Sequence, residues 1–240
     1  MRKIKVLAIS ASPRKNGNTD FYLRQALKGL GETPIETEVT NFSFCGKRFG
    51  SCIGCLKCYE NGGSCILKDD FEQLRQLWID ADCIIYCLPV YVVGIPGQLK
   101  CFLDRLHNAT GHYYDVRSPR HLKVITCLVQ GCELFGGQEL ASVDIMKHAA
   151  LINSIYVAPD GSYTAASAWC GGREMDLLAA QSEYDCKEDY QISLESAVSA
   201  VKRAVELAAV IRTGMEKMEP VLSGDLRYRP YLDRIKLGKE

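Results

Sequence analysis

Four cysteines within fourteen residues have the clearest chemical potential in this sequence: Cys52, Cys55, Cys58 and Cys65. Thiolates spaced Cys-x2-Cys-x2-Cys can turn three sulfurs toward one centre. This arrangement suits an iron–sulfur cluster better than zinc, whose thiols usually come as two separated pairs. Gly62 and Gly63 can bend the chain so that the fourth thiol returns to the same centre. The residues alone leave three interpretations open: an iron–sulfur cluster, a zinc site, or reduced thiols without a metal.

A polar loop at residues 10–19 follows the first apolar run and precedes a segment with helical periodicity. The first N–H groups of a helix have no intrahelical partner, and the helix dipole places partial positive charge there. Ser12, Asn18 and Thr19 can add hydrogen bonds to phosphate oxygens, and Arg14 can add a charge-assisted contact. We predict a phosphate-binding loop; the alternative is a plain helix cap at Asn18 or Thr19. The loop has neither Gly-x-Gly-x-x-Gly nor the pattern of a nucleoside-triphosphate loop.

Apolar runs separated by helical segments must position these residues. Runs rich in β-branched residues predict strands at residues 4–9, 35–39, 83–88, 124–129 and 155–157. Helical periodicity predicts helices at residues 19–30, 69–80, 96–108, 138–151, 175–181 and 193–218. The first and third runs are continuously hydrophobic, which indicates strands covered on both faces. We therefore expect an α/β fold with a doubly wound, parallel, five-stranded sheet in a three-layer sandwich.

The expected organisation is one domain at residues 1–218 followed by an arm at residues 219–240. The domain carries a cysteine-rich insertion at residues 45–66 and an elaborated loop at residues 159–191. The arm mixes aromatic and basic residues, which suits docking on a partner subunit or packing on its own chain. The remaining cysteines lie mostly in apolar segments and are expected in the core. The four histidines have no partners at ligand spacing, and we expect structural or surface roles for them.

The amino-acid composition indicates which partners and which cellular compartment to expect for this protein. Lys plus Arg equals Asp plus Glu at 29 each, so neither nucleic acid nor a membrane is expected as a partner. No apolar stretch reaches the roughly 20 residues that cross a bilayer. The first residues are interpreted as a strand rather than a signal peptide. Twelve cysteines in such a chain indicate a reducing, cytoplasmic environment.

Two motifs in this order resemble the flavodoxin-like NADPH-dependent FMN reductase family. The first is Ser-x-Arg-x-x-Gly-Asn-Thr at residues 12–19; the second is residues 89–100, followed by Asp104-Arg105. The resemblance spans residues 1–158 and implies that the first loop holds the FMN phosphate and the second lies along the flavin ring. It assigns the phosphate to Ser10, Ser12, Arg14, Asn16, Asn18 and Thr19. It assigns the flavin to Pro89, Val90, Tyr91, Val92, Val93 and Gly94. A glycine-rich loop at residues 130–139 is expected to wall the flavin, with an ordinary turn as the alternative.

One branch of this family, the iron–sulfur flavoproteins, carries a compact cysteine motif between the second strand and the next helix. Cys52, Cys55, Cys58 and Cys65 have that pattern and that location. The resemblance implies a four-iron four-sulfur (4Fe-4S) cluster that exchanges electrons with FMN. No catalytic side chain is required, because the flavin carries the redox chemistry.

The resulting expectation is an FMN-dependent oxidoreductase that moves electrons between a ferredoxin-type or NAD(P)H donor and a small acceptor. A redox partner protein or a small-molecule acceptor is the expected partner, and a homodimer or homotetramer the expected assembly. Two alternatives remain at this point. One is a cluster-free NAD(P)H-dependent FMN or quinone reductase, and the other is a non-enzymatic redox-sensing or metal-binding module.

Overall fold

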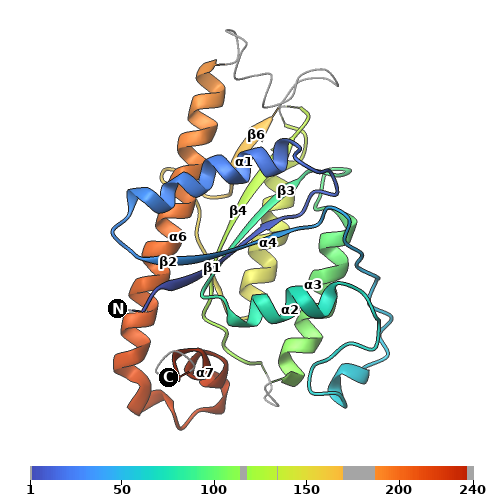
Figure 1. Cartoon of the computed structure of the whole chain (residues 1–240), viewed down its shortest axis with the longest axis vertical. Coiled ribbons are helices and arrows are strands. Elements are labelled where there is room, and N and C mark those ends of the chain that lie inside the picture. Colours follow the sequence, from blue (N-terminus) through green and yellow to red (C-terminus); the bar gives the residue numbers. More distant parts are fainter. Residues whose placement is uncertain (1, 114–117, 134, 170–186, 237–240) are drawn as a thin grey trace.

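A parallel β-sheet forms the centre of the computed structural model, which describes residues 2–113, 118–133, 135–169 and 187–236 (Figure 1). Its strands are β1 (Ile4–Ser10), β2 (Thr37–Ser43), β3 (Cys83–Pro89), β4 (Val124–Gly131), β5 (Ile155–Tyr156) and β6 (Ala166–Trp169). The strand order is β2-β1-β3-β4-β5, with β6 also paired to β4. This is the order of flavodoxin-like sheets. The predicted doubly wound parallel sheet is confirmed, with one additional short strand.

Two short strands share the fifth position of the sheet. Ile155 in β5 pairs with Val124 at the start of β4, whereas Ala166 in β6 pairs with Leu128 further along β4. The expected irregular loop at residues 159–191 was therefore too broad, since it contains β6 and the first residues of the last long helix. The sequence does not predict β6 because its four residues include no β-branched side chain. The helix expected at residues 175–181 lies outside the described residues.

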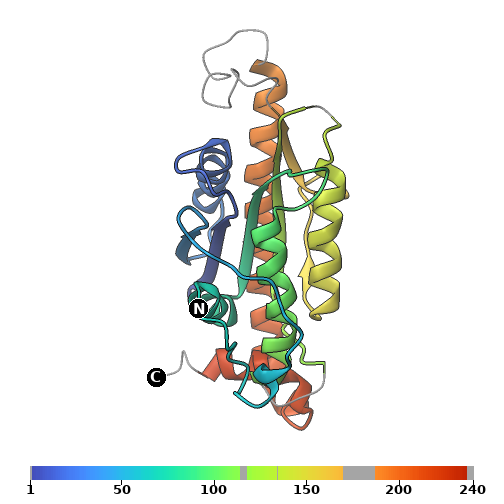
Figure 2. The ribbon, with the colours of Figure 1, turned by 90° about the vertical axis from the view of Figure 1, so that its right-hand side faces the viewer.

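Helices cover both faces of the sheet (Figure 2). One face carries α1 (Asn18–Ala26) and α6 (Lys187–Leu222), and the other carries α2 (Phe71–Asp80), α3 (Gly97–Tyr113) and α4 (Gln138–Leu151). Successive residues of β3 alternate between the two layers. Ile85 packs with α1 and α6, whereas Ile84 and Tyr86 pack with α2, α3 and α4. Both faces are buried, as the continuous hydrophobicity of this strand predicted.

Element boundaries differ most at the sheet edge and at the ends of helices. The second strand runs from Thr37 to Ser43 rather than over residues 35–39, because β2 is an edge strand whose side chains are mostly exposed. A 3-10 helix, η1 (Leu27–Glu32), continues the chain after α1. The last long helix extends beyond the predicted residues 193–218 at both ends. No helix within the described ranges is long and apolar enough to cross a membrane.

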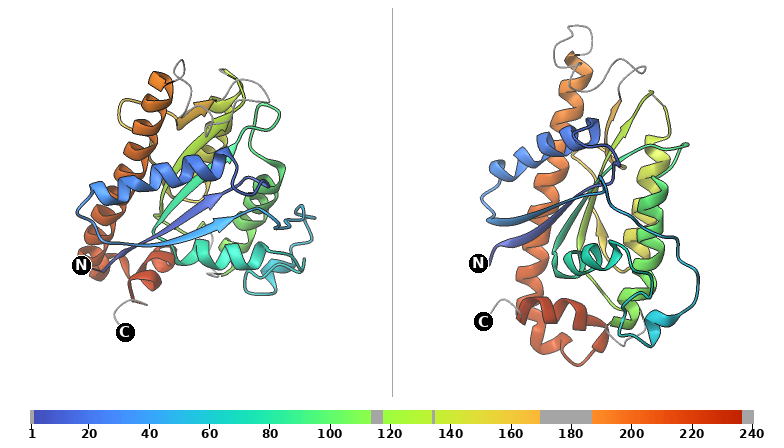
Figure 3. Two further views of the ribbon diagram at one scale, coloured as in Figure 1. Left: turned by 45° about the horizontal axis from the view of Figure 1, so that its top comes forward. Right: turned by 45° about the vertical axis from the view of Figure 1, so that its right-hand side comes forward.

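Parallel strands bring three loops to one edge of the sheet (Figure 3). These are the loops that follow β1, β3 and β4, at residues 11–17, 90–96 and 132–137. The chain after β2 leaves this edge and runs beside α3 to the short 3-10 helix η2 (Lys57–Tyr59). The Tyr59 hydroxyl lies 3.4 Å from Asn108 Oδ1, near the carboxyl end of α3. The fold thus presents two separate places for chemistry, one at each end of α3.

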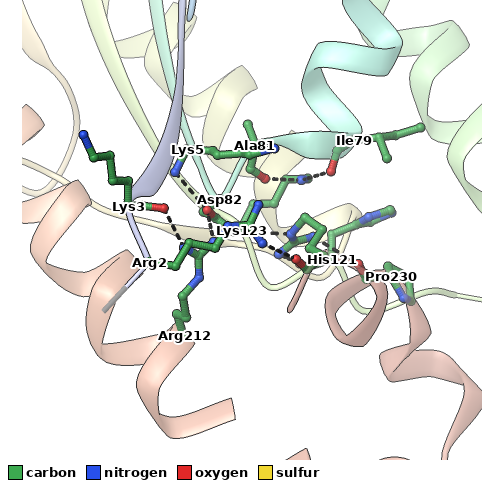
Figure 4. Close-up of polar contacts among 11 residues, drawn as sticks. Arg2, Lys3, Lys5, Ile79, Ala81, Asp82, His121, Lys123, Arg212 and Pro230 are labelled. Carbon is green, nitrogen blue, oxygen red and sulfur yellow. Dashed lines mark hydrogen bonds and ion pairs between the residues drawn. The ribbon is translucent and has the colours of Figure 1, made fainter. Parts of the chain in front are cut away.

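The C-terminal segment packs on its own chain, one of the two possibilities left open by its sequence. It comprises η4 (Leu226–Tyr228) and α7 (Arg229–Lys236), and it begins later than predicted because α6 continues to Leu222. A buried carboxylate, Asp82, accepts a hydrogen bond from the N–H of Lys5 at 3.0 Å and pairs with Arg212 (Figure 4). Arg234 Nε lies 3.5 Å from the same carboxylate. This network ties α6 and α7 to the amino ends of β1 and β3.

Candidate functional site

The first loop of the edge leads from β1 into α1. Ser10 ends the strand, Gly17 precedes the helix, and no side chain caps the helix start. Ser12 and Thr19 are buried at either side of the loop. A helix start without a side-chain cap, preceded by buried hydroxyl groups, suits an anion that accepts from backbone N–H groups.

Some polar side chains of this loop already form hydrogen bonds within the chain, and others are exposed. The Ser10 hydroxyl donates to the Asp20 carboxylate, and the Ser12 hydroxyl oxygen accepts the N–H of Arg14 at 3.2 Å. Arg14 and Asn16 are exposed, and Asn16 has a φ of 54°, a left-handed conformation that asparagine tolerates. The six predicted phosphate residues thus lie in this loop or at the strand and helix ends that flank it. The structure also shows one feature that sequence reasoning missed, the use of Ser10 by an acidic residue.

The second loop contains a strained apolar turn. Tyr91 and Gly94 exchange two backbone hydrogen bonds, of 3.0 and 3.2 Å, and Val92 and Val93 form the tip between them. Val92 has a φ of 49° and Val93 a φ of 64°. Branched side chains rarely adopt this left-handed region, and each such residue costs about 1–3 kcal/mol. Val92 is also 99% exposed, so the turn holds an apolar side chain in solvent at the edge where the loops meet.

The third loop packs directly on this turn. Gly137 has a φ of 101°, and a Cβ placed on it would lie 2.7 Å from the Cα of Val93. Gln138 donates from Nε2 to the Glu133 carbonyl at 2.7 Å, while its buried Oε1 has no hydrogen-bond partner in the described structure. Phe135 on this loop is 84% exposed. The second and third loops therefore form one apolar rim beside the polar first loop.

The four clustered cysteines meet at a different place. Cys52, Cys55, Cys58 and Cys65 all line one small pocket, whose water-accessible volume is about 30 Å³. Arg105, Asn108 and Ala109 of α3 form its opposite wall. Cys52 and Cys55 are exposed, whereas Cys58 and Cys65 are half-buried. The loop thus places all four thiols around one space.

The backbone of this pocket suits an anionic group. Gly54 and Leu56 both have left-handed φ angles, of 64° and 58°. Left-handed residues in a turn can direct successive backbone N–H groups into a concavity that binds an anion. Gly62 and Gly63 are also left-handed. The Gly63 N–H donates to the Cys58 carbonyl at 2.9 Å, which returns the chain toward the fourth cysteine.

The four thiols are neighbours but do not converge on one point. Burial raises the pKa of the Cys58 thiol, and Cys65, Cys52 and Cys55 raise it further. Within the described residues, no three His, Cys, Asp or Glu side chains are grouped closely enough to hold a metal ion. The residues therefore supply the donor set of a four-thiolate cluster, and the exposed side chains would have to turn inward to bind it.

Two carboxylates anchor the cysteine loop, a feature that the sequence did not reveal. Asp69 accepts two hydrogen bonds from Arg105, at 2.6 and 3.0 Å, and one from the N–H of Gly50 at 2.7 Å. Burial opposes the charge of this carboxylate, but its hydrogen bonds from Arg105, Gly50 and Phe71 hold its pKa below the ordinary value. The next residue, Asp70, accepts from Lys47 Nζ at 2.9 Å. The sequence does not reveal the pairing with Arg105, because it does not show that this residue on α3 faces Asp69.

The two sites are separated along one helix. The flavin-loop residues precede Gly97 at the start of α3, and the cysteine pocket contacts Arg105 and Asn108. At 1.5 Å per residue, the helix places these positions roughly 12 to 17 Å apart. The structure therefore does not bring the cysteines into the same cavity as the three-loop edge of their own chain.

Three of the six other described cysteines are buried as predicted, and Cys45 and Cys101 are half-buried. Cys83, Cys87 and Cys127 are buried in β3 and β4. Cys132 is exposed, contrary to expectation, because it follows β4 in the loop at the sheet edge. Two further cysteines, at positions 170 and 186, lie outside the described residues.

Comparisons with known proteins agree with this geometry. A profile of the family described as NADPH-dependent FMN reductase matches residues 4–169. An iron–sulfur flavoprotein of Methanocaldococcus jannaschii is 34% identical over 209 residues, covering 87% of this chain and 100% of the relative. An iron–sulfur flavoprotein of Archaeoglobus fulgidus is 32% identical over 219 residues, covering 90% and 100%. A solved azoreductase from Bacillus anthracis shares the fold, with a TM-score of 0.57 at 14% identity, covering 83% of this chain and 99% of its own.

Proposed function

Because this chain belongs to the NADPH-dependent FMN reductase family, in its iron–sulfur flavoprotein branch, we propose that it joins FMN to a cysteine-bound 4Fe-4S cluster. Its membership makes it an FMN-dependent oxidoreductase, so the non-enzymatic interpretation is set aside. The observation that carries the cluster proposal is that Cys52, Cys55, Cys58 and Cys65 line one pocket. The protein would move electrons between a ferredoxin-type or NAD(P)H donor and a small acceptor.

The three-loop edge is the proposed FMN site. The start of α1, with Ser12, Arg14 and Thr19, would hold the phosphate through backbone and side-chain donors. Tyr91 and the exposed valine turn offer apolar surface to the flavin ring. The flavin supplies hydride and electron transfer, and these residues bind and orient it.

The cysteine pocket is the proposed cluster site. An iron–sulfur cluster needs thiolate ligands, and the positive φ angles at Gly54 and Leu56 suit a loop that wraps an anion. When bound, the cluster would supply one-electron exchange. The chain holds the loop at its entry through Asp69 and Asp70.

A homodimer or homotetramer is part of the proposal. The flavin edge and the neighbouring start of α4 leave Val92, Phe135 and Leu140 exposed. Large apolar side chains gathered in one region commonly mark an interface. Analytical ultracentrifugation should show an assembly larger than one chain, and a monomer at micromolar concentration would contradict this part.

Iron, acid-labile sulfide and flavin per chain, measured on anaerobically purified protein, test the central proposal. About four iron, four sulfide and one FMN are expected. Cys55→Ser should lose iron and the broad cluster absorbance while retaining FMN. Cys132→Ser is the matched control, because Cys132 is equally exposed but lies outside the pocket. Wild-type protein that holds FMN without iron or sulfide would contradict the cluster.

That last outcome would favour the second candidate, a cluster-free NAD(P)H-dependent FMN or quinone reductase. The observation in its favour is that the metal-binding side chains of the described residues do not converge. Steady-state NAD(P)H oxidation by iron-free, FMN-loaded protein with added FMN or quinone would support it.

A further inference from the structure

We propose that Arg105 is a positioning residue that raises the reduction potential of the cysteine-bound cluster by fixing a buried positive charge beside Cys65. This inference rests on the proposed function, because it assumes that the pocket holds a cluster. It assigns to α3, which separates the two sites, a role in tuning one of them.

The guanidinium of Arg105 is held in place by several contacts. Its side chain is 1% exposed, and Nη1 lies 2.6 Å and Nη2 3.0 Å from the two oxygens of Asp69. Nη1 also donates to the Gly50 carbonyl at 3.2 Å. The planar group stacks over Phe71, with Cζ 4.1 Å from the ring centroid. A paired, stacked and buried arginine keeps its charge and its orientation.

This charge faces the thiols rather than the solvent. Arg105 lines the cysteine pocket together with Cys65, whereas its partner Asp69 does not. The two hydrogen bonds to Asp69 hold the guanidinium of Arg105 in this wall of the pocket. Its Nε is buried and has no hydrogen-bond partner in the described structure. The ion pair therefore places its cation, rather than its carboxylate, in the wall of the cysteine pocket.

The positive charge of Arg105 predicts the direction in which its loss would shift the reduction potential of the cluster. A cluster held by four thiolates is anionic, and its reduction adds a further negative charge. A fixed cation nearby stabilises the more negative, reduced state, and the net charge and hydrogen bonds around the sulfurs are known determinants of potential. The loss of Arg105 should therefore make the cluster harder to reduce.

Asp69, the carboxylate paired with Arg105, provides a second variant whose expected shift in the reduction potential has the opposite sign. Arg105→Gln removes the cation and should shift the midpoint potential of the cluster to a more negative value. Asp69→Asn keeps the shape of the side chain but removes the opposing anion, so it should shift the potential to a more positive value. A merely structural ion pair would not move the potential in opposite directions. The readout is a redox titration followed by electron paramagnetic resonance of the cluster.

Arg212→Gln is the matched control. Arg212 is also buried and paired with an aspartate, Asp82, but it lies on α6 on the other face of the sheet. Its loss should leave the potential unchanged. FMN content reports folding independently, because the flavin edge lies at the far end of α3. If Arg105→Gln loses FMN, Asp69→Asn decides the matter through the sign of its shift.

The outcomes separate the two proposals. An unchanged potential in both variants, or a shift of the same sign in both, overturns the role of Arg105 while leaving the cluster in place. Wild-type protein without iron and sulfide overturns the proposed function, and the role of Arg105 falls with it.

Discussion

Gly137 and Val93 touch through their backbones: a Cβ at Gly137 would lie 2.7 Å from both the Cα and the Cγ1 of Val93. Gly137 is also left-handed, with a φ of 101°. This contact joins the loop after β4 to the turn that follows β3. It makes the shape of the flavin turn depend on a residue 44 positions later in the chain.

Gly137→Ala should disturb this turn and weaken FMN binding. The added methyl group cannot fit without moving Val93, and the left-handed backbone adds strain of about 1–3 kcal/mol. We expect the Kd for FMN, measured by quenching of flavin fluorescence, to rise at least about tenfold, equivalent to 1.4 kcal/mol. Gly161→Ala is the control, because Gly161 is also left-handed but nothing lies within 4 Å of its added Cβ. Equal losses of FMN affinity in the two variants would refute the contact as the cause.

Arg14→Ala should weaken FMN retention through loss of a phosphate contact. Arg14 is exposed beside the start of α1, where its guanidinium can reach an anion. Hydrogen bonds to charged groups contribute about 1.5–3 kcal/mol, so the Kd should rise about tenfold or more. The neighbouring exposed cation provides the control, since Lys15→Ala removes the same charge from the same loop. Equal effects of the two substitutions would indicate long-range attraction rather than a specific contact.

Val92→Asn should stabilise the FMN-free protein and weaken FMN binding. Asparagine accepts a φ of 49° better than valine does, so relief of strain should add about 1 kcal/mol to the free energy of unfolding in urea. The same change removes apolar surface that faces the proposed flavin. Val143→Asn, in the right-handed backbone of α4, should bring no gain in stability. A destabilised Val92→Asn protein would show that the left-handed valine is not a source of strain.

Much of the fold was predictable because strands buried on both faces form continuous apolar runs in the sequence. The predicted strand at residues 83–88 matches β3 to within one residue, and the helix at residues 138–151 matches α4. The edge strand β2 was misplaced because exposed strands lack a continuous apolar run. Three of the four residues of β6 are alanine or serine, which carry little strand signal.

The sequence predicts candidate ligands for both sites but not the contacts that support them. Spacing predicts the four cysteines as ligands, and the position of a polar loop before a helix predicts the phosphate site. The left-handed valines run against the preference of branched residues, so no propensity could foresee them. The contact of Arg105 with Asp69 joins residues 36 positions apart, and only the packing of α3 reveals it. Pairing across that distance leaves no local pattern in a single sequence.

The buried His148 should make the protein less stable in acid. Burial lowers its pKa to about 3, from an ordinary value of 6.5. The Tyr86 hydroxyl lies 3.4 Å from its Nε2. Below pH 6.5 this histidine binds a proton in the unfolded chain but stays neutral in the folded protein. Its contribution to the free energy of unfolding is therefore complete above pH 6.5 and decreases as the pH falls toward 3. Between pH 7.5 and pH 5 the loss from this one group should be about 2 kcal/mol.

Urea unfolding of the wild type and of His148→Gln at a series of pH values tests this sign. The variant should be less stable at pH 7.5 but should lose less free energy of unfolding on acidification. Burial also lowers the pKa of His121, so part of the wild-type pH dependence should persist in the variant. His107→Gln changes an exposed histidine on α3 that makes a smaller contribution than burial to the lowered pKa of His148, so it should change this pH dependence much less than His148→Gln does. If His148→Gln retains the wild-type pH dependence, the histidine is protonated in the folded protein as readily as in the unfolded chain, and its burial has no part in acid sensitivity.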